Sequence, residues 1–318
     1  MSLKTLLFLI MNTTLNISSQ VHFDLTTYTA YKMKHPYKIF YLVSLAFICC
    51  GQVSNNPALV AQTLQATEQK ELIYDTGSTI QTRFNPPTEF ERITVAENSF
   101  ANYLRNLPLK PVGSKVKYFD GRIKDDFAYE AVVDMEIGNT DLQQCADAVM
   151  RLRGEYFYEK KLYDSISFTL TNGFPVDYTQ WMKGNRIVVN GNKTTWKNIA
   201  APSNTHEDFR KYMDLVFTYA GSLSLSKTLH SKNIKDISIG DVFILGGFPG
   251  HAVIVVDMAE NKSGEKVFML AQSYMPAQET QILRNLNDDK LTPWYSEKIV
   301  GELVTPQWTF STDQLKTW

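Results

Sequence analysis

Three short apolar runs follow one another between positions 240 and 276. The runs are Val242–Leu245, Ala252–Val256 and Val267–Ala271. Gly, Asn, Ser or Pro bounds each of them, and the middle one is almost entirely β-branched, which is typical of strands. The polar segment Met258–Glu265 predicts a hairpin loop between the second and third runs. We therefore expect three consecutive antiparallel strands.

The hairpin predicts a pairing between a histidine and a carboxamide. If Asp257 pairs with Lys266 at the loop, His251 lies opposite Gln272, and opposed residues share one face of a sheet. The oxygen of Gln272 would then accept the Nδ1 proton of His251 and leave Nε2 free as a base. The alternative is a half-buried strand histidine with a satisfied hydrogen bond and no chemical role.

Apolar residues at helical spacing predict three helices. They cover Ser99–Asn106, positions 140–158 and positions 206–219. In the second, Thr140 is the expected N-cap, and a glutamine three residues later completes a capping-box pattern. This start would place Cys145 in the second turn, on the inward face of the helix.

Shorter patterns complete the expected fold. Strands are expected at Lys115–Phe119, Tyr129–Ile137 and Ile166–Leu170, and the aromatic tail from Thr292 onward is expected to pack over the sheet. Together these elements predict an α+β domain over residues 81–318, with an antiparallel sheet against which a helix packs. The net charge is −1, so the chain has no excess of positive charge that would attract nucleic acid. We therefore do not expect nucleic acid as a partner.

The first fifty residues have the pattern of an export signal. A short basic segment from Met33 precedes the apolar run Ile39–Ile48, which is too short to span a bilayer comfortably. We expect residues 1–50 to be a signal region, with Met33 as the true start of the protein. Residues 51–80 are polar and predict a linker.

Two adjacent cysteines, Cys49 and Cys50, follow the apolar run directly. The segment resembles a bacterial lipoprotein signal, in which a cysteine after the apolar run is acylated; either of the two would be acylated here. The resemblance implies an exported protein, periplasmic or in the outer membrane, held to the membrane by an N-terminal lipid anchor. A plain secretory signal or a short membrane anchor is the alternative.

Cys145 then remains as the one cysteine of the exported part. It has no intramolecular disulfide partner, so it is either an inert core residue or a free reactive thiol. We find no cofactor motif and no zinc-ligand spacing, and expect neither a cofactor nor a metal.

The order of these residues resembles papain-like enzymes of the bacterial cell wall, the cysteine- and histidine-dependent amidohydrolases and peptidases. The resemblance rests on Gln144-Cys145, on Gly240-Asp241 opening the strand before the histidine, on His251 with the apolar residues after it, and on Gln272. It implies a papain-like fold. It also implies that a polar residue on the following strand orients the histidine.

A second resemblance covers most of residues 95–310. Segments such as FANYLRNLPLKPVGSKV, DLQQCADAVMRLR, PGHAVIVVDM and AQSYMPAQE are similar to an uncharacterised family of bacterial exported proteins, known as a domain of unknown function. That family implies no established activity.

From these patterns we expect a thiol hydrolase of the cell envelope that cleaves an amide bond. Cys145 would be the nucleophile, His251 the base and Gln272 the residue that orients it. Backbone N–H groups near the helix start would stabilise the oxyanion with the help of Gln144. Peptidoglycan or an envelope peptide is the expected substrate.

Two alternatives stay open. The chain could be a non-catalytic binding module with an inert cysteine, which holds an envelope peptide or glycan near Trp181, Arg186 and Tyr274. It could also be a structural lipoprotein that docks a partner through its aromatic tail.

Overall fold

The three apolar runs form the central strands of the protein. In a computed structural model of the chain they are β8 (Val242–Leu245), β9 (His251–Asn261) and β10 (Lys266–Gln272). The strands are antiparallel neighbours, as predicted. The structure describes residues 71–318. The expected signal region, both candidate acylation sites and residues 51–70 of the expected linker lie outside these residues.

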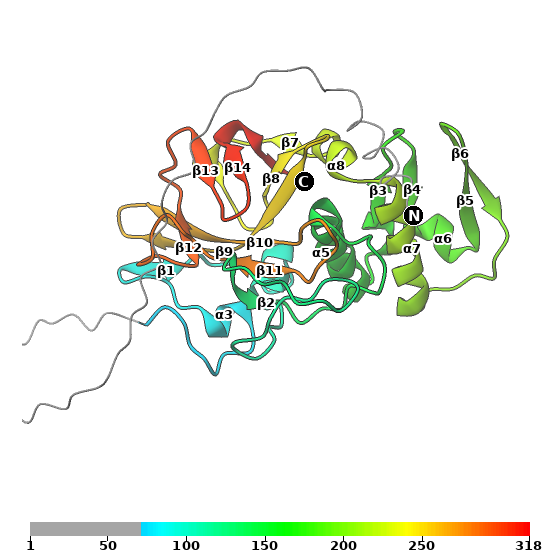
Figure 1. Ribbon diagram of the computed structural model, residues 1–318. Helices are drawn as coiled ribbons and strands as arrows, with labels where there is room; N and C mark the ends of the chain where they lie inside the picture. Colours follow the sequence, from blue (N-terminus) through cyan, green and yellow to red (C-terminus); the bar gives the residue numbers. More distant parts are fainter. Residues whose placement is uncertain (1–70) are drawn as a thin grey trace, which may run out of the picture. The chain divides into compact units, whose positions relative to one another are not determined.

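Both faces of the central sheet are buried, which explains why the strand runs are apolar without interruption. Along β9, Ala252 and Ile254 belong to one hydrophobic cluster, whereas Val253 and Val255 belong to the other. Helical residues fill the first cluster, and residues of the C-terminal segment fill the second. Figure 1 shows the C-terminal strands β13 and β14 above β9 and β10.

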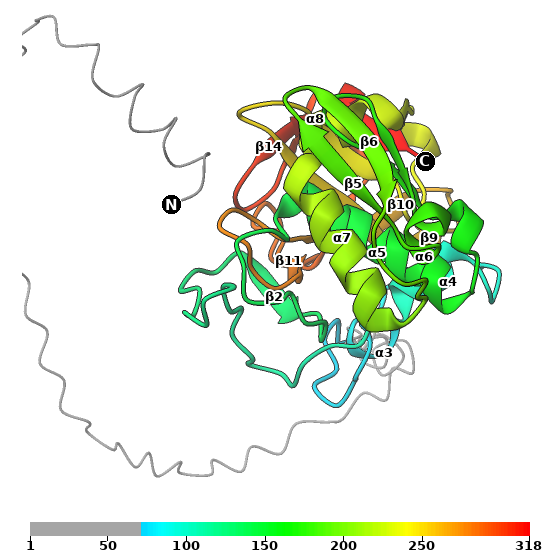
Figure 2. The same cartoon turned by 90° about the vertical axis from the view of Figure 1, so that its right-hand side faces the viewer.

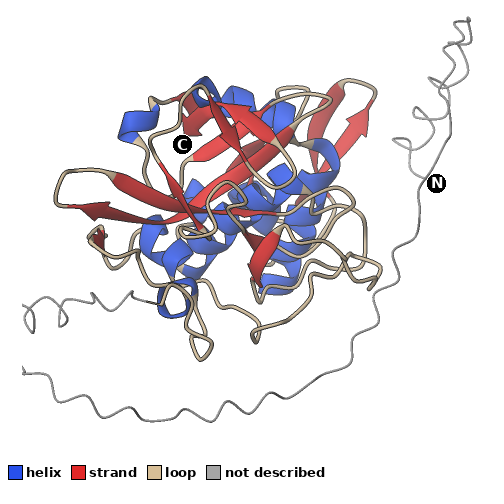
Figure 3. Cartoon of the chain, turned by 60° about the vertical axis from the view of Figure 1, so that its left-hand side comes forward, coloured by secondary structure: helices blue, strands red, loops and turns tan. Residues whose placement is uncertain are grey.

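The main sheet has the strand order β2-β11-β10-β9-β8-β15-β7, with β1 added along β9 and β12 along β10. Every pairing in it is antiparallel. The described residues thus form a mixed α and β fold built mostly on antiparallel strands, and Figure 3 shows the strands crossing over a group of helices. The remaining strands are β1 Phe90–Arg92, β2 Tyr129–Val132, β3 Ser167–Thr169, β4 Pro175–Asp177, β5 Asn185–Asn190, β6 Lys193–Asn198, β7 His230–Ser231, β11 Gln281–Leu283, β12 Trp294–Ser296, β13 Glu302–Val304, β14 Thr309–Ser311 and β15 Leu315–Thr317.

The long helices match the predicted periodicity. Helix α7 has the predicted bounds, and its apolar stripe is buried: Phe209, Tyr212, Met213, Val216 and Phe217. Helices α4 and α5 pack against β9. None of the described helices is long and apolar enough to cross a membrane. The helices are α3 Ile80–Arg83, α4 Phe100–Arg105, α5 Cys145–Glu159, α6 Tyr178–Met182, α7 His206–Tyr219 and α8 Ser222–Thr228.

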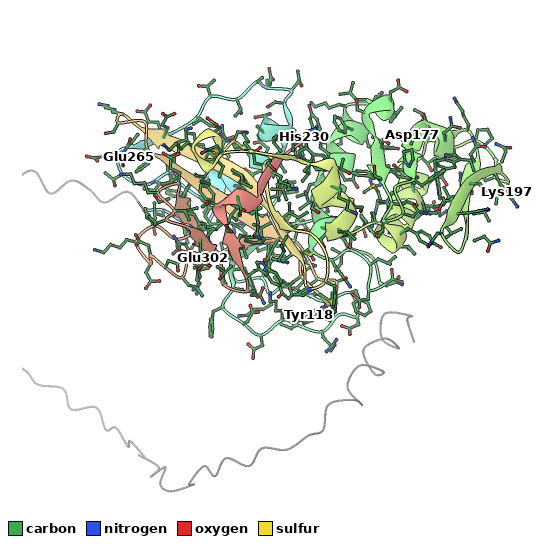
Figure 4. The ribbon with its side chains drawn as sticks, turned by 90° about the horizontal axis from the view of Figure 1, so that it is seen from above. Tyr118, Asp177, Lys197, His230, Glu265 and Glu302 are labelled. Carbon is green, nitrogen blue, oxygen red and sulfur yellow. The ribbon has the colours of Figure 1, made fainter. Side chains whose placement is uncertain are left out.

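A group of short elements extends from α5. Helix α7 contacts α5, and α6 joins α7 to the hairpin β5–β6 (Figure 2). Figure 4 shows Lys197 on β6 and Glu265, at the turn between β9 and β10, at opposite ends of the described residues. This hairpin is therefore remote from the turn of the central sheet.

Several local predictions were wrong. Strand β9 runs to Asn261, so the hairpin loop is shorter than Met258–Glu265. Segment Lys115–Phe119 forms only isolated bridges, and β2 ends at Val132 rather than Ile137. The C-terminal tail does more than cover the sheet, because its strands β12 and β15 pair with β10 and β8.

Candidate functional site

Cys145 is the first residue of helix α5, not a residue of its second turn. Gln144 is the N-cap, and the Asp147 carboxylate accepts the backbone N–H of Gln144 at 3.0 Å. The predicted start at Thr140 was wrong because the segment before Gln144 follows a bend instead of a helical turn. At this position the positive end of the helix dipole acts directly on the thiol.

The N-terminus of α5 is tied to the segment after β10. The Gln144 side-chain amide donates to Asp141 Oδ1 at 3.0 Å, and the same oxygen accepts the backbone N–H of Ala277 at 2.7 Å. The Ser273 hydroxyl lies 3.1 Å from the carbonyl oxygen of Gln143. These bonds hold the helix start beside the end of the strand that carries Gln272.

His251 opens β9 directly after a glycine that the backbone requires. A Cβ at Gly250 would lie 2.4 Å from the carbonyl oxygen of Gly247, which no side chain tolerates. The imidazole is buried, and its Nε2 lies 2.8 Å from Gln272 Oε1. The bond between the two predicted residues therefore exists, but through Nε2. Nδ1 is the nitrogen left as a possible base, and the expectation that Gln272 binds Nδ1 was wrong.

Three aromatic rings surround the imidazole. The ring centroid of Tyr274 lies 4.7 Å away, that of Trp308 5.3 Å and that of Phe310 5.8 Å. Trp308 and Phe310 come from the C-terminal segment, so this segment closes the site over His251. This role could not be predicted, because the pattern of an aromatic tail does not indicate which residue it covers.

Burial lowers the pKa of His251 from 6.5 to about 4. The hydrogen bond with Gln272 raises the pKa, and the positive charge of Lys124 lowers it further. Loss of hydration disfavours the charged imidazolium, so the ring is neutral at pH 7.

The Cys145 thiol lies at the start of β9. The backbone N–H of Ala252, the residue after His251, acts on it as a hydrogen-bond donor. Burial raises the pKa of the thiol to about 11, and the Asp147 carboxylate adds to this, although backbone N–H groups oppose it. Burial also raises the pKa of the Tyr274 hydroxyl, and the nearness of Cys145 raises it further. Tyr274 thus lies beside both His251 and Cys145, where α5 and β9 begin.

Trp181 and Arg186 belong to a different part of the fold. The Arg186 guanidinium lies 3.8 Å above the Trp181 ring, and the Trp181 indole N–H donates to Asp208 at 2.8 Å. Trp181 is buried. It contacts Tyr212, whereas Tyr274 contacts His251. The structure therefore does not bring the three expected ligand-binding residues together.

A cavity of about 550 Å³ lies beside α4 and the later turns of α5. Its lining includes Tyr103, Glu155 and Glu159, but none of Cys145, His251, Gln272 or Tyr274. Within residues 71–318, no three His, Cys, Asp or Glu side chains are grouped as a metal site would require.

The described residues form a mixed α and β domain in which a thiol and an imidazole both lie beside Tyr274. The family described as domain of unknown function 4846 matches residues 80–317, and the chain belongs to this family. No curated protein and no solved structure matches the chain.

Proposed function

We propose that the protein is a thiol hydrolase that cleaves an amide bond with a papain-like arrangement of side chains. The observation that carries the proposal is the position of Cys145 as the first residue of α5, beside the residue that follows His251. The hydrogen bond that Gln272 Oε1 accepts from Nε2 of His251 holds the imidazole in its orientation. A helix N-terminus, a neighbouring base and a group that orients the base are the parts that activate a thiol.

In the proposed reaction the neutral thiol of Cys145 and the neutral imidazole of His251 act by general-base catalysis. Nδ1 of His251 takes the thiol proton as the sulfur of Cys145 attacks the carbonyl carbon. The imidazolium then gives this proton to the leaving nitrogen as the C–N bond breaks, which leaves a thioester on Cys145. Water, deprotonated by the same imidazole, hydrolyses the thioester and releases the acid.

The backbone N–H groups of Ala146, Ala252 and Cys145 itself act on the thiol as hydrogen-bond donors. We assign them the stabilisation of the negative oxygen of the tetrahedral intermediate. Gln144, expected from the sequence to help, acts here as a support, because its amide binds Asp141.

The compartment suggests the substrate. An exported, lipid-anchored protein of the envelope, in the periplasm or the outer membrane, meets peptidoglycan and envelope peptides, and their amide bonds suit a thiol hydrolase. This part of the proposal rests on the sequence of the first fifty residues.

The test is hydrolysis of purified muropeptides, followed by mass spectrometry of the products. The wild type should release products with new amino termini. Cys145→Ala should abolish this with an unchanged circular dichroism spectrum, and Gln272→Ala should leave partial activity. Lys227→Ala, at an exposed position of α8, is the control and should cleave as the wild type does. Cleavage that survives Cys145→Ala would overturn the assignment of the nucleophile.

A non-catalytic binding module is the second candidate. The neutral forms of both Cys145 and His251 and the cover of Trp308 over the ring favour it. Such a module would bind the same peptides without turnover. Calorimetric binding of muropeptides with unchanged affinity in Cys145→Ala, and no products, would select it over the hydrolase.

A further inference from the structure

A buried lysine lies two carboxamides away from the imidazole of His251. The side chain of Lys124 is 2 % exposed, and its Nζ donates to Gln307 Oε1 at 2.9 Å. The Asp126 carboxylate lies 3.3 Å from the same Nζ and keeps the ammonium paired. The nitrogen of Gln272 donates to Gln307 Oε1 at 2.7 Å. A continuous path therefore runs from Lys124 through Gln307 and Gln272 to His251.

Lys124 and Asp126 fix the orientation of the Gln307 amide. An ammonium can only donate hydrogen bonds and a carboxylate can only accept them. Gln307 turns its oxygen to Lys124, and its Nε2 donates to Asp126 Oδ2 at 3.2 Å. A flipped amide would place donor against donor at Lys124 and acceptor against acceptor at Asp126. Only one orientation satisfies both contacts.

This orientation is passed on to Gln272 and from there to the imidazole. Because Gln307 presents an oxygen, Gln272 must present its NH₂ group to it. The oxygen of Gln272 then faces Nε2 of His251 at 2.8 Å, and an oxygen there accepts only from a protonated nitrogen. The proton of the neutral ring therefore belongs on Nε2, and the lone pair on Nδ1.

We propose that Lys124 is a positioning residue that sets the tautomer of His251 through Gln307 and Gln272. The catalytic meaning of this relay rests on the proposed function, since only a base needs a lone pair on a particular nitrogen. The relay itself is a statement about proton positions and holds whether or not Cys145 reacts. The relay also explains why a lysine is buried near this site, although the positive charge of Lys124 disfavours the imidazolium form of His251.

Other polar groups border the path without belonging to it. Gln281 Oε1 lies 3.4 Å from the Lys124 ammonium, and the Gln281 amide donates to Gln278 at 3.1 Å. Gln281 lies opposite Gln272 across β11 and β10, but neither glutamine side chain hydrogen-bonds to His251 or Gln272, so replacing the Gln281 amide removes a neighbour of Lys124 and leaves the path intact. This makes Gln281→Met a matched control.

The experiment is nitrogen-15 NMR of histidine-labelled full-length protein at pH 7. The signals of His251, assigned by their loss in His251→Gln, should show one tautomer with a pyrrole-like Nε2 and a pyridine-like Nδ1. Lys124→Met and Gln307→Leu should each shift the tautomer ratio toward Nδ1–H by about tenfold or more, because the Gln272 amide is then free to turn. Lys124→Arg, which keeps only donors, should retain the wild-type tautomer, as should Gln281→Met.

A single Nε2–H tautomer that persists in folded Lys124→Met and Gln307→Leu would overturn the relay, as would an Nδ1–H ring in the wild type. If Lys124→Met does not fold, Gln307→Leu, in a partly exposed loop, decides alone. The hydrolysis of muropeptides by the same variants is measured separately. If the two variants show the tautomer shift while the wild type cleaves no muropeptide, the proposed function is refuted and the relay is kept.

Discussion

His251 and Gln272 share a 2.8 Å hydrogen bond although their strands do not place them opposite each other. The register of β9 and β10 shifts between Met269 and Leu270, after which Ala271 pairs with Ile254. Continued to the strand end, this register sets Tyr274 opposite His251, with Gln272 two residues away on the same face. The predicted pairing of Asp257 with Lys266 was therefore wrong. His251 and Gln272 still share one face of the sheet, because Gln272 is displaced by two residues, an even number, from the position opposite His251. Because Gln272 lies diagonally across from His251, the position opposite His251 is left for Tyr274, which lies beside the Cys145 thiol.

The first prediction concerns the reactivity of the Cys145 thiol. With a pKa of about 11, only about one thiol in ten thousand is ionised at pH 7, against roughly three in a hundred for a free cysteine. Iodoacetamide should therefore alkylate Cys145 about two orders of magnitude more slowly than a free thiol at pH 7. The rate should rise about tenfold per pH unit up to alkaline pH. Mass spectrometry of the labelled peptide gives the rate.

The comparison for this prediction is the protein unfolded in urea, in which the same thiol should react at the rate of a free cysteine. An activated thiolate would give an alkylation rate that levels off below about pH 8 in the folded protein. Such a rate would contradict a neutral Cys145 thiol beside a neutral His251 in the resting protein.

The second prediction concerns stability at acid pH. The pKa of His251 is about 4 in the folded protein and about 6.5 in the unfolded chain, so between these values the unfolded chain binds more protons. The stabilisation is complete above pH 6.5 and is lost as the pH falls toward 4. The free energy of unfolding should drop by about 2 kcal/mol more between pH 7 and pH 5 in the wild type than in His251→Gln. Urea unfolding followed by circular dichroism measures both.

Because all other titrating groups are common to the two proteins, the difference between them isolates His251. If the free energy of unfolding falls with pH in parallel for the wild type and His251→Gln, the imidazole is not held neutral by burial.

The elements of the fold that were predicted correctly are those that depend on a pattern of neighbouring residues. The strands follow from uninterrupted apolar runs, and α7 begins and ends where its stripe predicts. The start of α5 was missed because Thr140 satisfies the usual capping pattern, whereas glutamine at position 144 is an uncommon N-cap.

The candidate site was predictable only in part. His251 and Gln272 lie on successive strands, and their chemistry is visible in their residue types. Lys124 and Gln307 are 183 residues apart in loops without periodicity, so nothing local indicates that they meet. Which nitrogen of the imidazole faces Gln272 follows from the side-chain torsion angles of His251, which residue types do not indicate, and that is why the expectation of Nδ1 was wrong.

The third prediction concerns the aromatic cover over His251. Trp308→Ala should admit water to the imidazole and raise the pKa of His251 from about 4 toward 6.5, by about one unit or more. An NMR titration of the ring protons measures the shift. Phe248→Ala is the matched control, since Phe248 lies just before β9 and is 86 % exposed; it should leave the pKa unchanged. An unchanged pKa in Trp308→Ala would show that Phe310 and the sheet alone desolvate the ring.

The fourth prediction concerns a buried carboxylate that holds β9 to its neighbours. Asp257 is fully buried and accepts from Arg105 at 2.6 Å and from Arg92 at 2.7 Å. It thereby joins β9 to α4 and β1 at the point where the strand register shifts. Asp257→Ala would leave two partly buried guanidinium groups without their shared partner. The expected loss is about 3–5 kcal/mol of the free energy of unfolding, because an uncompensated buried charge costs far more than the pair contributes.

Urea unfolding of Asp257→Ala beside Glu265→Ala provides the decisive comparison. Glu265 pairs with Lys298 on the surface at the turn after the same strand, and its loss should leave the unfolding midpoint unchanged. Arg92→Met combined with Asp257→Ala should recover part of the lost stability, since one unpaired charge is then gone. If Asp257→Ala unfolds at the same urea concentration as Glu265→Ala, water must reach the two arginines, and the pair does not hold β9 in place.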